Sequence, residues 1–100
     1  MSARPEVARW ASELDLDKAL CRDLLHAWQP HDAWFDKDKR EYRRILRCIR
    51  CGTERRSWVT QSGIQHGVYY AYKPGYRAPD GTGFLSKDER GAVRLRAMGI

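Results

Sequence analysis

The sequence contains few of the features that build a secreted or membrane protein. It has three cysteines in 100 residues. This number is small for a disulfide framework, and because it is odd, any single disulfide would leave one cysteine unpaired. No apolar run approaches the roughly 18 residues of a membrane-spanning helix, and the first six residues lack the apolar segment of a signal peptide. We therefore expect a cytoplasmic protein without a membrane partner, whose cysteines are metal ligands or plain thiols.

The composition predicts a small folded domain with a thin core. Hydrophobic residues make up 42% of the chain and include four tryptophans, which argues against disorder. Charged residues make up 32%, and the mean hydropathy is −0.74. We expect one domain over residues 1–100, small enough that a bound metal would contribute appreciably to its stability.

The positive charge is concentrated in the middle of the chain. Residues 1–38 carry five basic and eight acidic side chains, residues 39–56 carry eight and two, and residues 57–100 carry six and three. The central segment alone therefore has a net charge of +6. Such a concentration favours a polyanion such as DNA or RNA as partner, although surface arginines are often only solvated.

A metal-binding turn lies inside this basic segment. Cys48 and Cys51 have the Cys-x2-Cys spacing of a zinc knuckle, in which a tight turn brings both sulfurs to one ion. Gly52 follows at once and relieves the bend. This is half of a zinc site, and the other half must come from elsewhere in the chain.

The missing ligands are sought among Cys21 and three histidines, His26, His31 and His66. Cys21 and His26 are the nearest pair with finger-like spacing. They would lie about 140° apart on a continuous helix, so the helix must end between them, and Pro30 is expected to stop it soon after. We predict one structural Zn²⁺ at this site. Four protein ligands leave no open coordination position for water, which argues against metal catalysis. His31 is the reserve ligand, should His26 not bind. The predicted ligands are Cys21, His26, Cys48 and Cys51.

Residues 40–50 allow two interpretations. Tyr42, Ile45, Leu46 and Ile49 have helical spacing, and a helix would place Arg40, Arg43, Arg44 and Arg47 on one basic face. A strand is favoured instead, because a knuckle of this kind usually joins two strands. His66 lies near the next turn with no obvious carboxylate partner, and we expect an exposed histidine there.

The remaining patterns predict an α+β fold, with a small antiparallel sheet around the knuckle. In the first helices Leu16, Leu20 and Leu24 are expected to be buried. In the last helix Ala92, Leu95 and Met98 are expected to face the body of the protein. Ser86 and Glu89 have the spacing of a capping box at the start of that helix. The expected helical region is 1–28, with one helix over 5–14 and a second that Asp15 or Asp17 caps and that runs to about Leu24. A zinc-ribbon-like sheet is expected over 32–77, with strands 33–35, 42–48, 56–60 and 65–72, and a last helix over 86–98.

Three segments within residues 20–77 carry a likeness to known proteins. Their residues are Cys21, Arg22, Leu25, His26, Trp28, Arg44, Leu46, Arg47, Cys48, Arg50, Cys51, Gly52, Thr53, Arg55, Tyr70, Tyr72, Pro74, Gly75 and Tyr76. With these residues the chain resembles a family of small zinc-ribbon-like proteins of actinobacteria and their phages, although the family usually has glycine where Leu25 stands. The resemblance implies a shared metal site at the four predicted ligands and supports the strand interpretation. It also suggests a bacterial or phage-infected cell and a DNA-binding or regulatory role.

We therefore predict a protein that is not an enzyme, has no small-molecule substrate, and binds DNA or regulates transcription. The alternative is a protein-interaction module that docks on a host protein such as RNA polymerase, which exposed Trp34, Trp58 or Tyr76 would favour. Arginine predominates in the basic segment and suits bidentate contacts to phosphate or guanine. The predicted nucleic-acid contacts are Arg43, Arg44, Arg47, Arg50, Arg55 and Arg56.

Overall fold

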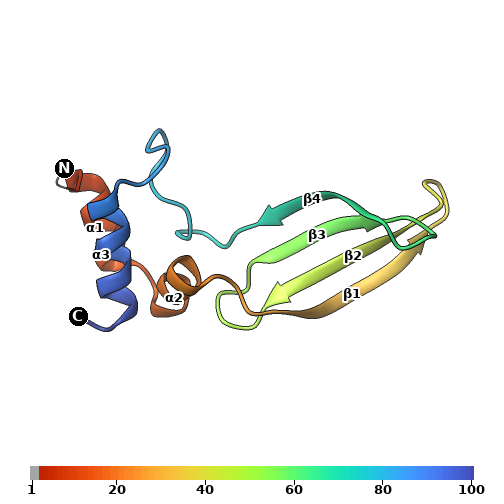
Figure 1. Ribbon diagram of the computed structural model, residues 1–100, viewed down its shortest axis with the longest axis horizontal. Coiled ribbons are helices and arrows are strands. Elements are labelled where there is room, and N and C mark those ends of the chain that lie inside the picture. Colours follow the sequence, from red (N-terminus) through yellow and green to blue (C-terminus); the bar gives the residue numbers. More distant parts are fainter. Residues whose placement is uncertain (1–2) are drawn as a thin grey trace. The chain divides into compact units, whose positions relative to one another are not determined.

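The computed structural model describes residues 3–100, which form three helices and one four-stranded sheet (Figure 1). The predicted α+β fold class is confirmed. No helix among residues 3–100 has both the length and the apolar character needed to cross a membrane. The helices are α1 (Pro5–Glu13), α2 (Leu16–Leu24) and α3 (Lys87–Ala97), and the strands are β1 (Trp28–Asp36), β2 (Glu41–Cys48), β3 (Glu54–Val59) and β4 (Gln65–Ala71).

The chain divides into two compact units. The helical unit comprises Met1–His26 and Pro74–Ile100, and the sheet unit comprises Ala27–Lys73. The three helices all belong to the first unit and the four strands to the second. Because two compact units can still belong to one domain, a single zinc-binding domain over residues 1–100 stays a prediction.

The helical unit has a small apolar core. Ala11, Leu14, Ala19 and Val93 are nearly fully buried against one another. Leu16 and Leu24, by contrast, are 48% and 61% exposed, so the prediction that they are buried is wrong. Trp10 and Leu85, which are partly buried, pack against this cluster instead.

The last helix begins as predicted, but only part of its expected inner face is buried. Ser86 caps it, and both hydrogen bonds of the capping box to Glu89 are present. Ala92 packs against the apolar core as expected, whereas Leu95 and Met98 are 49% and 64% exposed. The buried face of α3 instead carries Val93 and the carboxylate of Glu89.

Glu89 is the charged anchor of this unit. Its carboxylate is almost completely buried and accepts hydrogen bonds of 2.7 and 2.8 Å from the Arg4 guanidinium. It also accepts bonds from the backbone amides of Arg4 and Ser86. These donors stabilise the carboxylate, so the pKa of Glu89 is lowered, with the Arg4 hydrogen bond as the largest cause.

The sheet is antiparallel throughout, with strand order β1-β2-β3-β4. Residues 41–48 form a strand, so the favoured interpretation of this segment is confirmed and the helical one is wrong. Side chains therefore alternate between two faces of the sheet, and the arginines of β2 cannot share one face. Register shifts between Pro30 and Asp32 and between Arg56 and Trp58 bend the outer pairings locally.

Within residues 27–73 the sheet is a single layer, with no helix or second sheet of that unit packed on it. The turn between β3 and β4 uses Gly63 at φ 89°, as its position predicts. Few side chains of this unit are buried, namely Leu46, Cys48, Cys51, Thr53 and Ser57. Two of these five are predicted metal ligands.

Candidate metal centre

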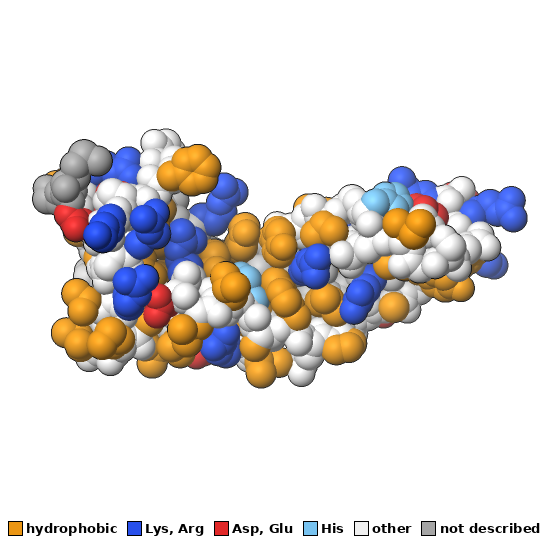
Figure 2. Space-filling view, viewed as in Figure 1, with side chains coloured by type: hydrophobic (Ala, Val, Ile, Leu, Met, Phe, Trp, Pro, Cys, Tyr) orange, Lys and Arg blue, Asp and Glu red, His pale blue; other side chains and the backbone are white. Residues whose placement is uncertain are grey.

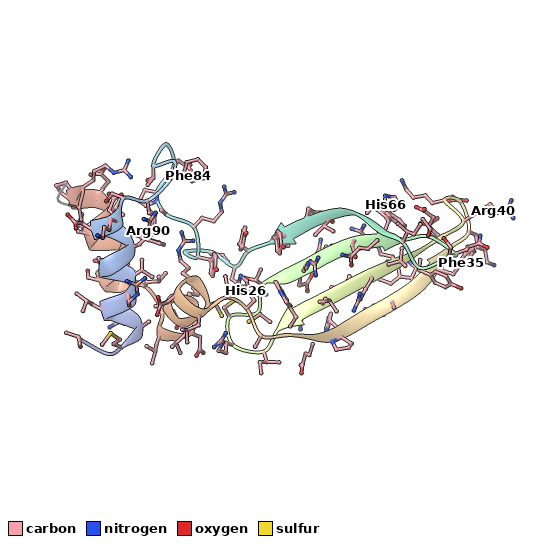
Figure 3. The ribbon with its side chains drawn as sticks, viewed as in Figure 1. His26, Phe35, Arg40, His66, Phe84 and Arg90 are labelled. Carbon is pink, nitrogen blue, oxygen red and sulfur yellow. The ribbon has the colours of Figure 1, made fainter. Side chains whose placement is uncertain are left out.

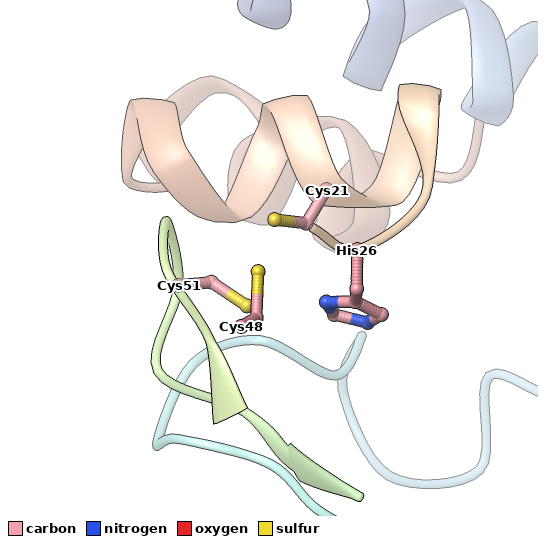
Figure 4. A group of neighbouring side chains, drawn as sticks. All are labelled: Cys21, His26, Cys48 and Cys51. Carbon is pink, nitrogen blue, oxygen red and sulfur yellow. The ribbon is translucent and has the colours of Figure 1, made fainter. Parts of the chain in front are cut away.

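The four predicted metal ligands form one group in the structure. The Sγ atoms of Cys21, Cys48 and Cys51 and a ring nitrogen of His26 all lie within 4.8 Å of one another (Figure 4). The three cysteines are buried, and none of them is in a disulfide. The reserve ligand His31 is exposed in β1 and lies outside the group. The arrangement can hold one metal ion.

The end of α2 brings Cys21 and His26 onto one side of the chain. The helix ends at Leu24, between the two ligands, as their spacing requires. The bend before His26 is made by Leu25, at φ 71° and ψ 173°, so the helix ends well before Pro30, which was expected to stop it. This backbone conformation is almost restricted to glycine, so the leucine stores strain of about 1–3 kcal/mol. The strain is the local cost of turning His26 back toward Cys21.

The other two ligands lie on a turn that closes β2. The amide of Gly52 donates to the carbonyl of Cys48 at 3.1 Å, and the amide of Cys48 donates to the carbonyl of Thr53 at 2.9 Å. Gly52 has φ 76°, and a Cβ at this position would lie 3.0 Å from Cε of Lys73. The backbone angle therefore favours glycine, whereas the flexible Lys73 side chain could move aside for a Cβ. The angle explains the predicted Cys-x2-Cys-Gly pattern.

Two ligands have hydrogen-bond partners beyond the group. The Cys51 thiol donates to Oγ1 of Thr53 at 3.1 Å, and Thr53 is completely buried. The hydroxyl of Tyr76 lies 3.0 Å from Nε2 of His26, and the two rings stack at 5.4 Å. Such partners orient ligands and set the tautomer of a histidine. Because Nε2 of His26 faces the Tyr76 hydroxyl, Nδ1 is the ring nitrogen that could bind a metal.

Contacts from α1 and α2 hold Tyr76 in place. Trp10 Nε1 donates to the carbonyl of Gly75 at 2.9 Å, and Lys18 Nζ donates to that of Pro74 at 2.9 Å. The Arg22 guanidinium donates to the Tyr76 carbonyl at 3.2 Å and lies over its ring. Sequence reasoning missed the role of Tyr76, although its Pro-Gly-Tyr segment was part of the family resemblance.

The six arginines predicted to bind nucleic acid do not share one surface. The strand register places Arg43, Arg47 and Arg56 on the face that carries Trp58, here called the Trp58 face. Arg44 and Arg55 lie on the opposite side, here called the Tyr70 face because Arg55 pairs with Tyr70. Arg50 lies in the turn after β2.

The arginines of the Trp58 face are bound within the sheet. Arg47 and Arg56 both pair with Glu54, at 2.8 and 2.6 Å. These two hydrogen-bonded arginines lower the pKa of Glu54 to about 2. Arg43 lies over the rings of Trp58 and Tyr69, at 4.6 and 5.3 Å from their centres. Much of the positive charge on this face is therefore already engaged.

His66 has a partner that the sequence did not reveal. Its Nε2 lies 2.9 Å from a carboxylate oxygen of Glu41, across the sheet. In Figure 3, His66 lies at the end of the sheet where both hairpins turn, and Phe35 and Arg40 lie at the same end. Histidine and carboxylate come from β4 and β2, which are not neighbours in the sheet, so only the register of β3 between them brings the pair together.

Comparison with protein-family models, with curated proteins and with solved structures finds no match for this chain. The resemblance to small zinc-ribbon-like proteins of actinobacteria and phages therefore stays a prediction. The functional interpretation rests on the chain's own residues, which form one group of three cysteines and one histidine that can hold a metal ion.

Proposed function

We propose that this chain is a non-enzymatic nucleic-acid-binding protein, stabilised by one structural Zn²⁺, that binds DNA and regulates transcription. The observation that carries the proposal is the charge of the sheet unit. Residues 27–73 contain ten lysines and arginines and five acidic residues, a net charge of +5. The rest of the chain has nine basic and eight acidic residues, a net charge of +1. The excess positive charge that attracts a polyanion thus belongs to one unit.

Zinc is the ion that this group of ligands suits best. Three thiolates and one imidazole form a Cys3His set, which zinc binds tetrahedrally in structural sites. At a zinc–sulfur distance near 2.3 Å, the sulfurs of a tetrahedral site lie about 3.8 Å apart. The observed limit of 4.8 Å therefore requires little movement of the ligands. Four protein ligands leave no open position for water, which supports a structural role for the ion.

The direct test is binding of the zinc-loaded chain to labelled DNA over a range of salt concentrations. If all six predicted arginines contacted phosphates of a duplex, log affinity would fall against log salt with a slope of about −5. Engagement of fewer arginines gives a proportionally smaller slope. Affinity that does not change with salt contradicts the proposal, because phosphate contacts release counterions.

A second candidate is a module that docks on a host protein such as RNA polymerase. It is favoured by a hollow of about 360 Å³ in the helical unit, lined by Arg22, Arg90 and Arg94 and by a completely exposed Phe84. Figure 3 labels Phe84 and Arg90. An exposed aromatic side chain among arginines is a common anchor of protein interfaces.

The aromatic residues of the sequence prediction give this candidate limited support. Trp34 is 44% exposed, Trp58 is half-buried, and Tyr76 is buried against His26. Pull-down from lysate with and without nuclease separates the two candidates. A protein partner retained in stoichiometric amount after nuclease treatment supports docking, and loss of all partners supports nucleic-acid binding.

A further inference from the structure

The two faces of the sheet differ in their acidic residues. On the Trp58 face the strands carry four carboxylates, from Asp32, Asp36, Glu41 and Glu54. Among the paired strand residues of the Tyr70 face there is none. The strand register, which the sequence pattern does not fix, therefore sorts the acidic side chains to one side.

The arginines of the Tyr70 face have no carboxylate to neutralise them. Neither Arg44 nor Arg55 makes an ion pair within residues 3–100. Nε of Arg55 is buried and makes no hydrogen bond. The two guanidinium groups are thus positive charges without an internal counterion.

Aromatic rings flank these two arginines. Tyr70 stacks on Tyr72 with ring centres 6.0 Å apart and contacts Trp28 at the same distance. Tyr42 and Phe35 form an edge-to-face pair at 5.2 Å near the other end. Tyr70 and Tyr42 are 44% and 45% exposed, so both keep open surface. Figure 2 shows hydrophobic and basic side chains interspersed over the strands in one view.

We propose that the Tyr70 face binds single-stranded nucleic acid, with bases stacked on Tyr70 and Tyr42 and phosphates held by Arg44 and Arg55. This inference rests on the proposed function and names its substrate class. Exposed rings can stack on bases only where the faces of the bases are open, which a duplex prevents. A face without carboxylates, carrying unpaired arginines, fits a polyanion better than an ordinary protein surface of mixed charge.

The spacing of the two tyrosines sets a minimum length for the ligand. Tyr42 pairs with Val59 and Tyr70 with Arg55, so they lie four residues apart along the strands and two strand spacings apart across them. Strand geometry makes this about 16 Å. A stacked single strand at about 3.4 Å per nucleotide needs about five nucleotides to span it. Affinity for oligothymidylate should rise up to about that length and then level off.

The first experiment compares two double variants of the zinc-loaded full chain. Arg44→Gln with Arg55→Gln removes two charges from the Tyr70 face, and Arg43→Gln with Arg56→Gln removes two from the Trp58 face. Binding to labelled dT15, rU15 and a 15-base-pair duplex is followed by fluorescence anisotropy over a salt series. The first variant should reduce the salt slope for single strands by about 1.4. The second variant should reduce the slope less, because Arg43 and Arg56 are already engaged by Tyr69 and Glu54.

The second experiment tests the stacking. Tyr42→Leu with Tyr70→Leu should weaken binding to dT15 by at least about tenfold. Trp34 is as exposed as Tyr70 but lies on the Trp58 face. Trp34→Leu should therefore leave the affinity unchanged within about twofold. Circular dichroism and zinc content establish that each variant is folded. The rU15 arm shows whether RNA is bound as well as DNA.

The outcomes separate this inference from the proposed function. Loss of single-strand binding in the Tyr70-face variants alone supports both. If the wild type prefers the duplex, or if the Trp58-face variants cause the loss, the inference is overturned while nucleic-acid binding stands. If the wild type binds none of the three ligands, both fall, and protein docking becomes the better explanation of the basic surface.

Discussion

The helical unit and the sheet unit are stabilised in different ways. The helical unit buries an apolar cluster around Val93 and a paired charge at Glu89. The sheet unit buries five side chains, of which Leu46 alone is a large aliphatic residue. A single-layer sheet gains little from apolar burial, so it depends on other interactions. We therefore expect that loss of a bound metal would destabilise the sheet unit more than the helical unit.

The two units also differ in how their charged surface groups are paired. In the helical unit, charged groups such as Arg4 and Arg94 are held by Glu89 and Asp23. In the sheet unit, the Trp58 face is neutralised in a similar way, but the Tyr70 face is not. A binding surface is therefore expected on the part of the molecule that its own interactions satisfy least.

The largest expected effect comes from loss of the metal. Cys51→Ser should release the ion and unfold the sheet unit, because structural zinc contributes on the order of 10 kcal/mol in finger peptides. Amide hydrogen exchange should show lost protection in β2 and β3 and retained protection in α1 and α3. The matched control is His31→Ala, which changes a histidine outside the group and should keep both metal and protection. Equal loss in both units would contradict the comparison.

The next effect comes from one substitution made in each unit. Val93 is 3% exposed in the helical core, whereas Val68 is 37% exposed on the sheet. Val93→Ala should lower the free energy of unfolding by about 1–3 kcal/mol, through lost burial and a cavity. Val68→Ala should change it by less than about 0.5 kcal/mol. Urea denaturation measures both, and similar costs would show that the sheet has a core of its own.

A smaller effect, of opposite sign, is expected at Leu25. Leu25→Gly should raise the stability by about 1 kcal/mol, because glycine adopts φ 71° without strain and the lost side chain is 74% exposed. In the sheet unit Arg40 is also a non-glycine residue with a positive φ, of 57°. Arg40→Gly should give a smaller gain, since this value is typical of the left-handed region that other residues also visit. A lower thermal midpoint for Leu25→Gly would contradict the strain.

The smallest effect near neutral pH concerns Glu89. Its folded pKa lies below the ordinary value of 4.5, because Arg4 and backbone amides stabilise the carboxylate. Its contribution to the free energy of unfolding is therefore fully present above about pH 4.5, and it is lost as the pH falls toward the folded pKa. The thermal midpoint of the helical unit, followed by amide signals of α1 and α3, should be constant from pH 7 to 5 and then fall. In the Glu89→Gln variant the thermal midpoint should be lower at neutral pH. It should also fall less steeply below pH 5, because glutamine does not titrate.

Much of the fold could be predicted from local patterns. Alternation and turn residues predicted β4 and its hairpin with β3, and the Ser86 capping box predicted the start of α3, because these signals depend on neighbours in the sequence. The knuckle, and not alternation, favoured a strand at β2. The first strand was predicted at 33–35, but β1 already begins at Trp28. The exposure of Leu16 and Leu95 could not be predicted. An amphipathic pattern shows which face is apolar, but not whether another element covers it.

The site was predicted in part for the same reason. Cys48 and Cys51 have a local signature, and with few other candidates in the chain the pair Cys21 and His26 could be chosen. The partners Tyr76 and Thr53 depend on how distant segments meet. The division of the arginines depends on the strand register, which shifts whole sets of side chains between faces.

A metal bound by Cys21, His26, Cys48 and Cys51 is the central prediction for this chain. The most direct measurement is the metal content of the purified chain, together with its response to a chelator. We predict about one equivalent of zinc per chain, released by the chelator together with loss of sheet protection. A chain with less than about a tenth of an equivalent of metal that still melts cooperatively and ignores the chelator would contradict the account.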